Sequence, residues 1–240
     1  MRRSVSSLTT SSPERARGSS SSEFAWAVLP YDNDLLPFSL FGPPGVGKTM
    51  SAEATSEHVR KPLYVVGAGD LGTDPHELDE TLDEIFDIAH VWGAVVLIDE
   101  ADVFLEARSV HDIQRNALVA VFLRQLEYFA GILFLTTNRI KTFDEAFQSR
   151  IHISLRYSDL EESSRRLIWK AFLTKVGVAD GVSEEQWNSL AQTKVNGRQI
   201  KNAVRTAQAL AASTDSRLGF PHVSQVLSVM AQFEEDTKTI

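Results

Sequence analysis

The chain contains no cysteine among its 240 residues. Disulfides, thiolate metal sites and cysteine nucleophiles are therefore excluded, although this absence does not identify a cellular compartment. No run of 18 apolar residues occurs, so the sequence predicts no membrane-spanning helix. The formal net charge is −8, which makes nucleic acid an unfavoured partner, because sequence-independent binding to its phosphates needs a basic face.

The remaining composition is ordinary for a globular protein, with 43% hydrophobic and 23% charged residues. The exception is the segment 1–22, which holds nine serines and four arginines without hydrophobic periodicity and is predicted to be disordered. We expect an intracellular protein of the cytoplasm or nucleus. An Arg- and Ser-rich, acid-poor start is also typical of mitochondrial transit peptides, which keeps that compartment as an alternative.

Short apolar runs alternate with helical patterns over the first two thirds of the chain. Strands are predicted near 35–42, 62–67, 94–98, 131–135 and 151–155. Such alternation indicates an α/β fold, a parallel sheet sandwiched by helices. Beyond residue 158 the strand patterns stop, and helices are predicted near 159–176, 184–193, 197–213 and 220–234. The predicted organisation is therefore a disordered 1–22, an α/β domain over 23–157 and a small all-helical domain over 158–236.

The stretch "GPPGVGKT", residues 42–49, joins the first predicted strand to a helix. Its glycines permit backbone angles that other residues avoid, so successive N–H groups can turn inward around an anion. Lys48 adds a point charge, and Thr49 begins a helix whose positive dipole end faces the same place. This is the spacing of the phosphate-binding loop named Walker A, which predicts binding of a nucleoside triphosphate.

The stretch "VVLIDEAD", residues 95–102, ends a predicted buried strand with two acids. The carboxyl ends of parallel strands share one edge of the sheet, so Asp99 is expected near the phosphate loop. There Asp99 and the hydroxyl of Thr49 would position Mg²⁺. Glu100 is the candidate base that activates water. The alternative is that both acids only cap the following helix.

Three further polar residues are candidates. Asn138 follows the fourth strand, where its amide could reach the γ-phosphate or the attacking water. Arg198 lies in the first turn of a helix capped by Asn196, where a positive charge opposes the dipole unless an anion is near. Arg150 precedes the last strand. For all three, an ordinary turn or surface role is the alternative.

In their order and rough spacing, these motifs resemble those of AAA+ ATPases, a family of P-loop NTPases. The resemblance covers about residues 35–235, and the wording "FLRQLEYFAGILFLTTNR" is similar to a fungal branch in which such a core ends a longer protein. It implies ATP and Mg²⁺ as cofactors, ATP hydrolysis and a helical lid over the nucleotide. It also implies a homo-oligomeric ring, commonly a hexamer, that remodels a protein or other macromolecule.

The resemblance assigns roles only at matching positions. Asn138 would be sensor 1, Arg198 sensor 2, and Arg150 an arginine finger supplied to the neighbouring subunit, with Glu100 as the base. Mg²⁺ would be held by Thr49 and Asp99. The residues assigned to nucleotide binding are Gly42, Pro43, Pro44, Gly45, Val46, Gly47, Lys48, Thr49 and Asp99.

Three departures from the family pattern stand out. A second arginine often follows the finger by three residues, and Ile153 stands there. The loop after the second strand, "GAGDLGTDP", lacks the aromatic residue with which unfoldases thread polypeptide. The segment before the phosphate loop, "EFAWAVLPYDND", is short, as in a piece of a longer protein, which leaves open whether it forms an adenine pocket.

Two alternatives to an ATP hydrolase follow from the motifs. One is an ATP-binding assembly switch with little turnover, which the short segment before the loop favours and the intact Lys48, Asp99, Glu100 and Asn138 oppose. The other is a small-molecule kinase, which shares the phosphate loop. A kinase would need neither Glu100 beside Asp99 nor an arginine directed at a neighbour.

Overall fold

The structure, a computed structural model, describes residues 36–105, 112–139 and 145–238. Within these ranges one sheet has the strand order β2-β3-β4-β1-β5, and every neighbouring pair is parallel. The strands are β1 (Leu36–Phe41), β2 (Leu63–Gly67), β3 (Val95–Asp99), β4 (Ile132–Thr137) and β5 (Ile153–Arg156). The predicted parallel sheet is therefore confirmed, and all its strands end at the same edge.

Pro37 weakens the sequence pattern of the first strand, yet β1 lies inside the sheet, between β4 and β5. The geometry explains this. Leu36 N–H faces β4, where it donates to Gly131 O, so the next residue faces β5. Pairing with β5 begins only at Phe38, and the Pro37 carbonyl still accepts from His152 N–H. The missing N–H of Pro37 therefore costs the sheet no hydrogen bond, because the pairing with β5 starts after this residue.

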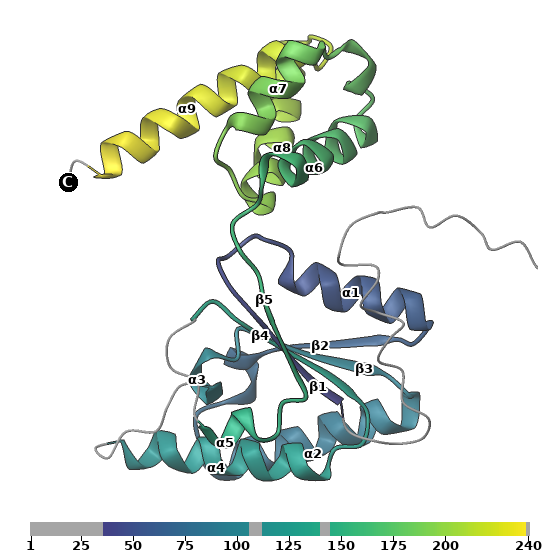
Figure 1. The fold of residues 1–240 in the computed structure, drawn as a ribbon, viewed down its shortest axis with the longest axis vertical. Helices are drawn as coiled ribbons and strands as arrows, with labels where there is room; N and C mark the ends of the chain where they lie inside the picture. The colour runs from purple at the N-terminus through teal and green to yellow at the C-terminus, as the bar shows by residue number, and fades with distance from the viewer. Residues whose placement is uncertain (1–35, 106–111, 140–144, 239–240) are drawn as a thin grey trace, which may run out of the picture. The chain divides into compact units, whose positions relative to one another are not determined.

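Helices cover both faces of the sheet (Figure 1). The helix α1 (Lys48–Val59) lies on one face, and α2 (Pro75–Trp92) and α4 (Ile113–Tyr128) lie on the other. Asp74 caps α2, because its side chain accepts from His76 and Glu77 N–H ahead of Pro75 at the first helical position. The short elements are η1 (Ala68–Leu71), α3 (Asp102–Leu105) and α5 (Glu145–Gln148).

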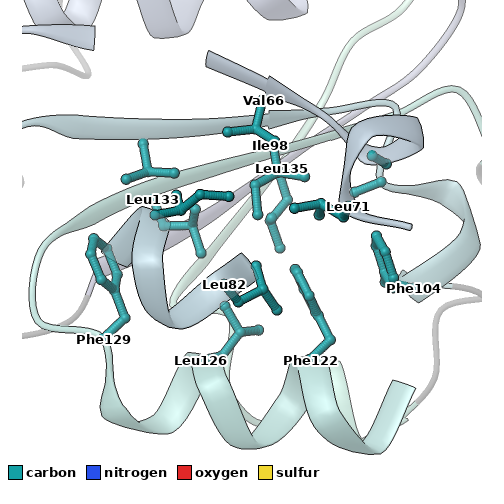
Figure 2. Packing of buried hydrophobic residues seen from close by; sticks show 14 of the residues in the cluster. Val66, Leu71, Leu82, Ile98, Phe104, Phe122, Leu126, Phe129, Leu133 and Leu135 are labelled. Carbon is teal, nitrogen blue, oxygen red and sulfur yellow. The ribbon is translucent and has the colours of Figure 1, made fainter. Parts of the chain in front are cut away.

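The main core lies between the sheet and the pair α2 and α4. Figure 2 shows Phe122 and Leu126 pointing from α4 toward Leu82 of α2 and toward the strand residues Ile98 and Leu135. All five side chains are fully buried. Burying a side chain of this size contributes about 1.5–3 kcal/mol, so this layer holds the ends of β3 and β4 in place.

Between Glu162 and Lys238 all regular elements are helices, as the sequence predicts. The elements are α6 (Glu162–Lys175), η2 (Ala179–Gly181), α7 (Glu184–Gln192), α8 (Gly197–Ser213) and α9 (Phe220–Lys238). They enclose a core of their own, which includes Trp169, Leu173, Trp187, Ile200, Val204 and Val223. The buried Arg165 closes the end of α7 by donating from Nε to Ala191 O at 2.6 Å.

In the part of the chain that the structure describes, no helix combines the length and the hydropathy needed to cross a membrane.

Candidate functional site

The phosphate loop joins the end of β1 at Phe41 to the start of α1 at Lys48. Gly42, Gly45 and Gly47 have φ angles of 148°, 73° and 106°, a region that side chains strongly disfavour. Gly42 is also required by space, because an added Cβ would overlap the carbonyl of Tyr157. The glycine spacing in the sequence therefore reflects an actual left-handed loop.

Tyr157, directly after β5, holds this loop at both ends. Its N–H donates to Phe41 O at 2.7 Å, just before the loop. Its hydroxyl donates to Ser51 Oγ at 2.7 Å, in the first turn of α1 after the loop. The last strand thereby fixes the position at which the loop begins and ends.

Lys48 is the buried cation of the site, with only 7% of its surface exposed. Its Nζ donates to Gly42 O at 2.7 Å, to Pro43 O at 2.7 Å and to Asn138 Oδ1 at 2.8 Å. Burial lowers the pKa of Lys48, and the negative charges of Asp99 and Asp102 oppose that shift. The ammonium group is therefore oriented by the loop and by the end of β4 together.

Thr49 and Asp99 meet across the gap between α1 and β3. The Thr49 hydroxyl lies 3.3 Å from both Oδ1 and Oδ2 of Asp99 and donates to this carboxylate. Asp99 Oδ1 also accepts from the hydroxyl of Thr136, which is buried at the end of β4. The site thus contains a carboxylate and a hydroxyl, both hard oxygen ligands of the kind that Mg²⁺ prefers.

Glu100 follows Asp99 in a left-handed conformation, with φ of 58°. A non-glycine residue in this region is strained by roughly 1–3 kcal/mol and persists only where its surroundings hold it. Here Glu100 N–H donates to Thr136 Oγ1 at 3.0 Å, and Ala101 N–H donates to Thr136 O at 2.9 Å. The Glu100 side chain is exposed at this same edge of the sheet.

Asn138 follows β4 and is held from two sides. Its backbone N–H donates to Asp102 Oδ1 at 3.2 Å, and the same oxygen accepts from the Thr137 hydroxyl. Its side-chain Oδ1 accepts from Lys48, which has only donors, so the amide NH₂ faces away from the ammonium. Asn138 can therefore still donate to a neighbouring acceptor.

Arg198 lies in the first turn of α8 and is exposed. The side chain of Asn196 caps this helix by accepting from Gln199 N–H at 2.9 Å. After burial and the two acids, the charge of Arg198 is a further influence on the Lys48 pKa, which it lowers. Arg198 is therefore close enough to the phosphate loop to act on its lysine electrostatically.

The start of α8 contacts the phosphate loop directly. Gly197 N–H donates to Gly45 O at 2.8 Å. A Cβ added at Gly45 would lie 2.6 Å from Asn196 Oδ1, and a Cβ added at Gly197 would lie 3.0 Å from Gly45 O. Both glycines thus permit an approach that any side chain would obstruct.

Arg150 is placed elsewhere, between α5 and α4. Its Nε donates to Glu127 Oε1 at 2.8 Å, its Nη2 forms an ion pair with the same oxygen, and its Nη1 donates to Ala146 O at 3.0 Å. None of these partners belongs to the phosphate loop. The structure therefore brings together Lys48, Thr49, Asp99 and Asn138, and leaves Arg150 outside this group.

Sequence reasoning missed Asp102, Thr136 and Thr137, which connect the assigned residues. Their signal was present: two hydroxyl residues end an otherwise apolar strand, and a third acid follows the pair in "DEAD". Nothing in the pattern showed which acid each hydroxyl would contact, because those contacts depend on the pairing of β3 with β4.

A parallel sheet with a glycine-lined loop after β1 and an acid pair at the end of β3 defines a P-loop nucleoside triphosphatase fold. Comparison of the sequence with protein families makes the assignment specific. The model of "ATPase family associated with various cellular activities (AAA)" matches residues 38–158, and the chain belongs to this family. Membership carries nucleotide binding and ATP-dependent activity as properties of the family.

Curated relatives agree with this assignment. ATPase family AAA domain-containing protein 3A homolog of Drosophila melanogaster is 33% identical over 136 residues, which are 53% of this chain and 22% of the relative. The human ATPase family AAA domain-containing protein 3A is 24% identical over 185 residues, 75% of this chain and 31% of the relative. The 26S proteasome regulatory subunit 6B homolog of Dictyostelium discoideum is 26% identical over 180 residues, 70% of this chain and 44% of the relative.

The chain spans less than half the length of each of these relatives. The likeness therefore concerns a part of each relative, and within this chain the family match falls on residues 38–158.

Proposed function

We propose that the chain binds ATP with Mg²⁺ at the phosphate loop, hydrolyses it, and couples hydrolysis to the remodelling of a protein or other macromolecule. The observation that carries this proposal is a hydrogen-bonded group at one edge of the sheet. Lys48 and Thr49 come from α1, Asp99 from the end of β3 and Asn138 from the end of β4.

The loop suits a phosphate chain. Gly47 has no side chain to cap α1, and the first turn of this 12-residue helix contains no acid. Its first N–H groups and its dipole therefore favour an anion. Lys48 adds a cation whose direction is set by three hydrogen bonds, which supports its assignment to the β- and γ-phosphates.

The residues also suit Mg²⁺. Among the described residues there is no group of three or more acidic, histidine or cysteine side chains able to hold a metal. Mg²⁺ commonly takes one or two carboxylates and completes its shell with water and substrate phosphates, which matches Asp99 and Thr49. Bound there, Mg²⁺ would neutralise charge that develops on the phosphates.

The remaining residues also have proposed roles. Glu100 accepts a proton from the attacking water, a role that its exposure and its position beside Asp99 support. Asn138 orients Lys48 with its oxygen and donates from its NH₂ to the γ-phosphate or the water. Arg198 compensates the phosphate charge from α8, so that residues 158–236 act as a lid on the α/β domain of 23–157.

Arg150 is proposed to serve the neighbouring subunit. Its present partner is Glu127 of the same chain, with 30% of the Arg150 side chain and 50% of the Glu127 side chain exposed. An ion pair this accessible to water is weak, about 0–1 kcal/mol, so phosphates of a neighbouring site can compete for the guanidinium. This role requires a homo-oligomeric ring, with a hexamer as the expected size.

The same ion pair also favours a second candidate, an ATP-dependent assembly switch with little turnover. If Arg150 stays on Glu127, each site binds ATP but lacks the charge that stabilises the transition state. The two candidates predict different rates of ATP turnover, and both predict ATP binding.

ATP turnover measured against protein concentration separates the two candidates. A hydrolase with shared sites shows specific activity that rises with concentration and then saturates. The Lys48→Ala variant is the control and should neither bind nor hydrolyse. ATP binding with zero turnover at every concentration would support the switch, and absence of binding in the wild type would refute both.

A further inference from the structure

Thr136 occupies a position from which one hydroxyl contacts two parts of the acid pair. It lies near the end of β4, paired with Leu40 of β1 and one residue beyond Leu135, the last position that pairs with β3. Its side chain is buried, with 1% of the residue exposed. Most buried polar groups have their hydrogen bonds satisfied, so the partners of this hydroxyl indicate its role.

The direction of each hydrogen bond follows from chemistry. The Asp99 carboxylate can only accept, so the Thr136 hydroxyl must donate its single proton to Oδ1. The hydroxyl oxygen then accepts from Glu100 N–H at 3.0 Å, because the backbone amide can only donate. Its donor and one of its acceptor sites are thus both used, each by a different acidic residue.

We infer that Thr136 is a positioning residue that sets the Asp99 carboxylate for Mg²⁺ and, through the same oxygen, holds the strained backbone of Glu100. This inference rests on the proposed function, and it names a residue that acts through Asp99 and Glu100 without touching the nucleotide. A single hydroxyl thereby ties metal binding and water activation to one strand end.

Two features of the geometry support this coupling. With Oδ1 engaged by Thr136, rotation of the Asp99 carboxylate would break a buried hydrogen bond. Oδ2 accepts a longer hydrogen bond, of 3.3 Å, from the Thr49 hydroxyl. With its N–H engaged, Glu100 is held at φ of 58° against the steric preference of its side chain. The Thr136 carbonyl also accepts a hydrogen bond from Ala101 N–H, the residue after Glu100.

The test is a Mg²⁺ titration of nucleotide binding with the fluorescent analogue mant-ATP. Thr136→Val keeps the branched shape and removes the hydroxyl. We expect the Mg²⁺ concentration for half-maximal binding to rise by about 10–100-fold, the usual effect of losing a residue that orients a metal ligand. Thr136→Ser retains the hydroxyl and should stay within about threefold of the wild type, as expected when this hydrogen bond persists.

Thr55→Val is the matched control. It makes the same change in α1, where the Thr55 hydroxyl donates to Ser51 O of its own helix at 2.7 Å. Its Mg²⁺ midpoint should equal that of the wild type. If valine is not accommodated at residue 136, Thr136→Ala also lacks the hydroxyl and must show the same shift.

Hydrolysis supplies the second readout. In Thr136→Val the turnover number at saturating Mg²⁺ should stay below that of the wild type, because Glu100 has lost its anchor, while KM for ATP changes less. An unchanged Mg²⁺ midpoint in Thr136→Val, or an equal shift in Thr136→Ser, would overturn the inference. A wild type that binds mant-ATP with Mg²⁺ but never hydrolyses it would refute the proposed hydrolase alone, because the midpoint test needs no turnover.

Discussion

Lys48 Nζ donates a 2.8 Å hydrogen bond to Asn138 Oδ1, although the two residues are 90 positions apart in sequence. The bond joins the phosphate loop to the end of β4. It also fixes which atoms of the Asn138 amide face the ammonium and which face away. The residue assigned as sensor and the residue assigned to the phosphates are therefore one unit.

Asn138→Ala removes both this acceptor and the NH₂ donor. We expect turnover to fall by about 10²–10³, the usual effect of losing one donor directed at developing negative charge. ATP affinity should change far less, since Gly42 and Pro43 still orient Lys48. Steady-state ATPase assays and calorimetric ATP binding check this, and a proportional loss of both quantities would contradict it.

Glu100→Gln keeps the shape of the side chain and removes its basicity. Binding of ATP with Mg²⁺ should persist while turnover falls by about 10²–10⁴, the usual contribution of a positioned base. Single-turnover ATPase assays measure this loss. Near-normal turnover would place the base elsewhere, and lost binding would make Glu100 a structural or metal-binding residue.

Gly45→Ala should disturb the contact between α8 and the phosphate loop, because its Cβ would lie 2.6 Å from Asn196 Oδ1. Gly47→Ala is the matched control, since Gly47 is also left-handed but its Cβ would meet no atom within 4 Å. Hydrogen exchange at the amides of Gly197 and Gln199 should accelerate in the first variant only. Equal exchange in both variants would mean that this contact is not formed in solution.

Arg198→Ala should weaken ATP binding more than ADP binding, because the γ-phosphate carries the additional charge that this guanidinium compensates. Arg205→Ala is the control. Arg205 is also exposed on α8, seven residues or about 10 Å further along the helix. Calorimetric titration with both nucleotides tests the difference. Equal small effects on ATP and ADP would return Arg198 to a surface role.

Arg150→Ala should bind ATP yet be nearly inactive, because an arginine finger contributes about 10³–10⁵ to turnover in related NTPases. Mixed with inactive Lys48→Ala, it should recover activity, since some interfaces then combine an intact loop with an intact finger. ATPase activity measured across mixing ratios, after subunit exchange, should peak at intermediate ratios.

Glu127→Gln serves as the control for that experiment, because it removes the charge of the ion-pair partner and leaves Arg150 in place. Its turnover should equal or exceed that of the wild type. Confirmed co-assembly of the two inactive variants without recovery at any ratio would argue against a finger acting between subunits.

Much of the fold follows from local sequence pattern. The apolar run before the phosphate loop predicted β1, although Pro37 argued against a strand. The sequence could not show that the pairing of β1 with β5 starts at Phe38, one residue after Pro37. Two helix starts were predictable from their capping residues, Asp74 and Asn196, which accept hydrogen bonds from amides two or three residues further on. Pro75 at the first helical position adds to the first of these signals. Such local signals are readable because both partners stand in one window of sequence.

Only part of the candidate site could be predicted, because only some of its contacts join residues that are close in sequence. The loop and the acid pair are contiguous motifs, and their spacing alone predicted Lys48 and Asp99. The contacts of Thr136 with Asp99, and of Gly197 with Gly45, join segments separated by 37 and by about 150 residues. They depend on strand order and on the approach of α8, which no short window contains.

Tyr157 connects the phosphate loop to the segment that follows β5, in addition to the loop's own connection to β1. It is bonded to the residue before the loop and to the helix after it, and its main chain abuts Gly42. The polypeptide then continues over four residues to Glu161, the N-cap of α6. We therefore expect a displacement of α6 to act on both ends of the loop through Tyr157, and a shift of the loop to reach α6 through the same short connection.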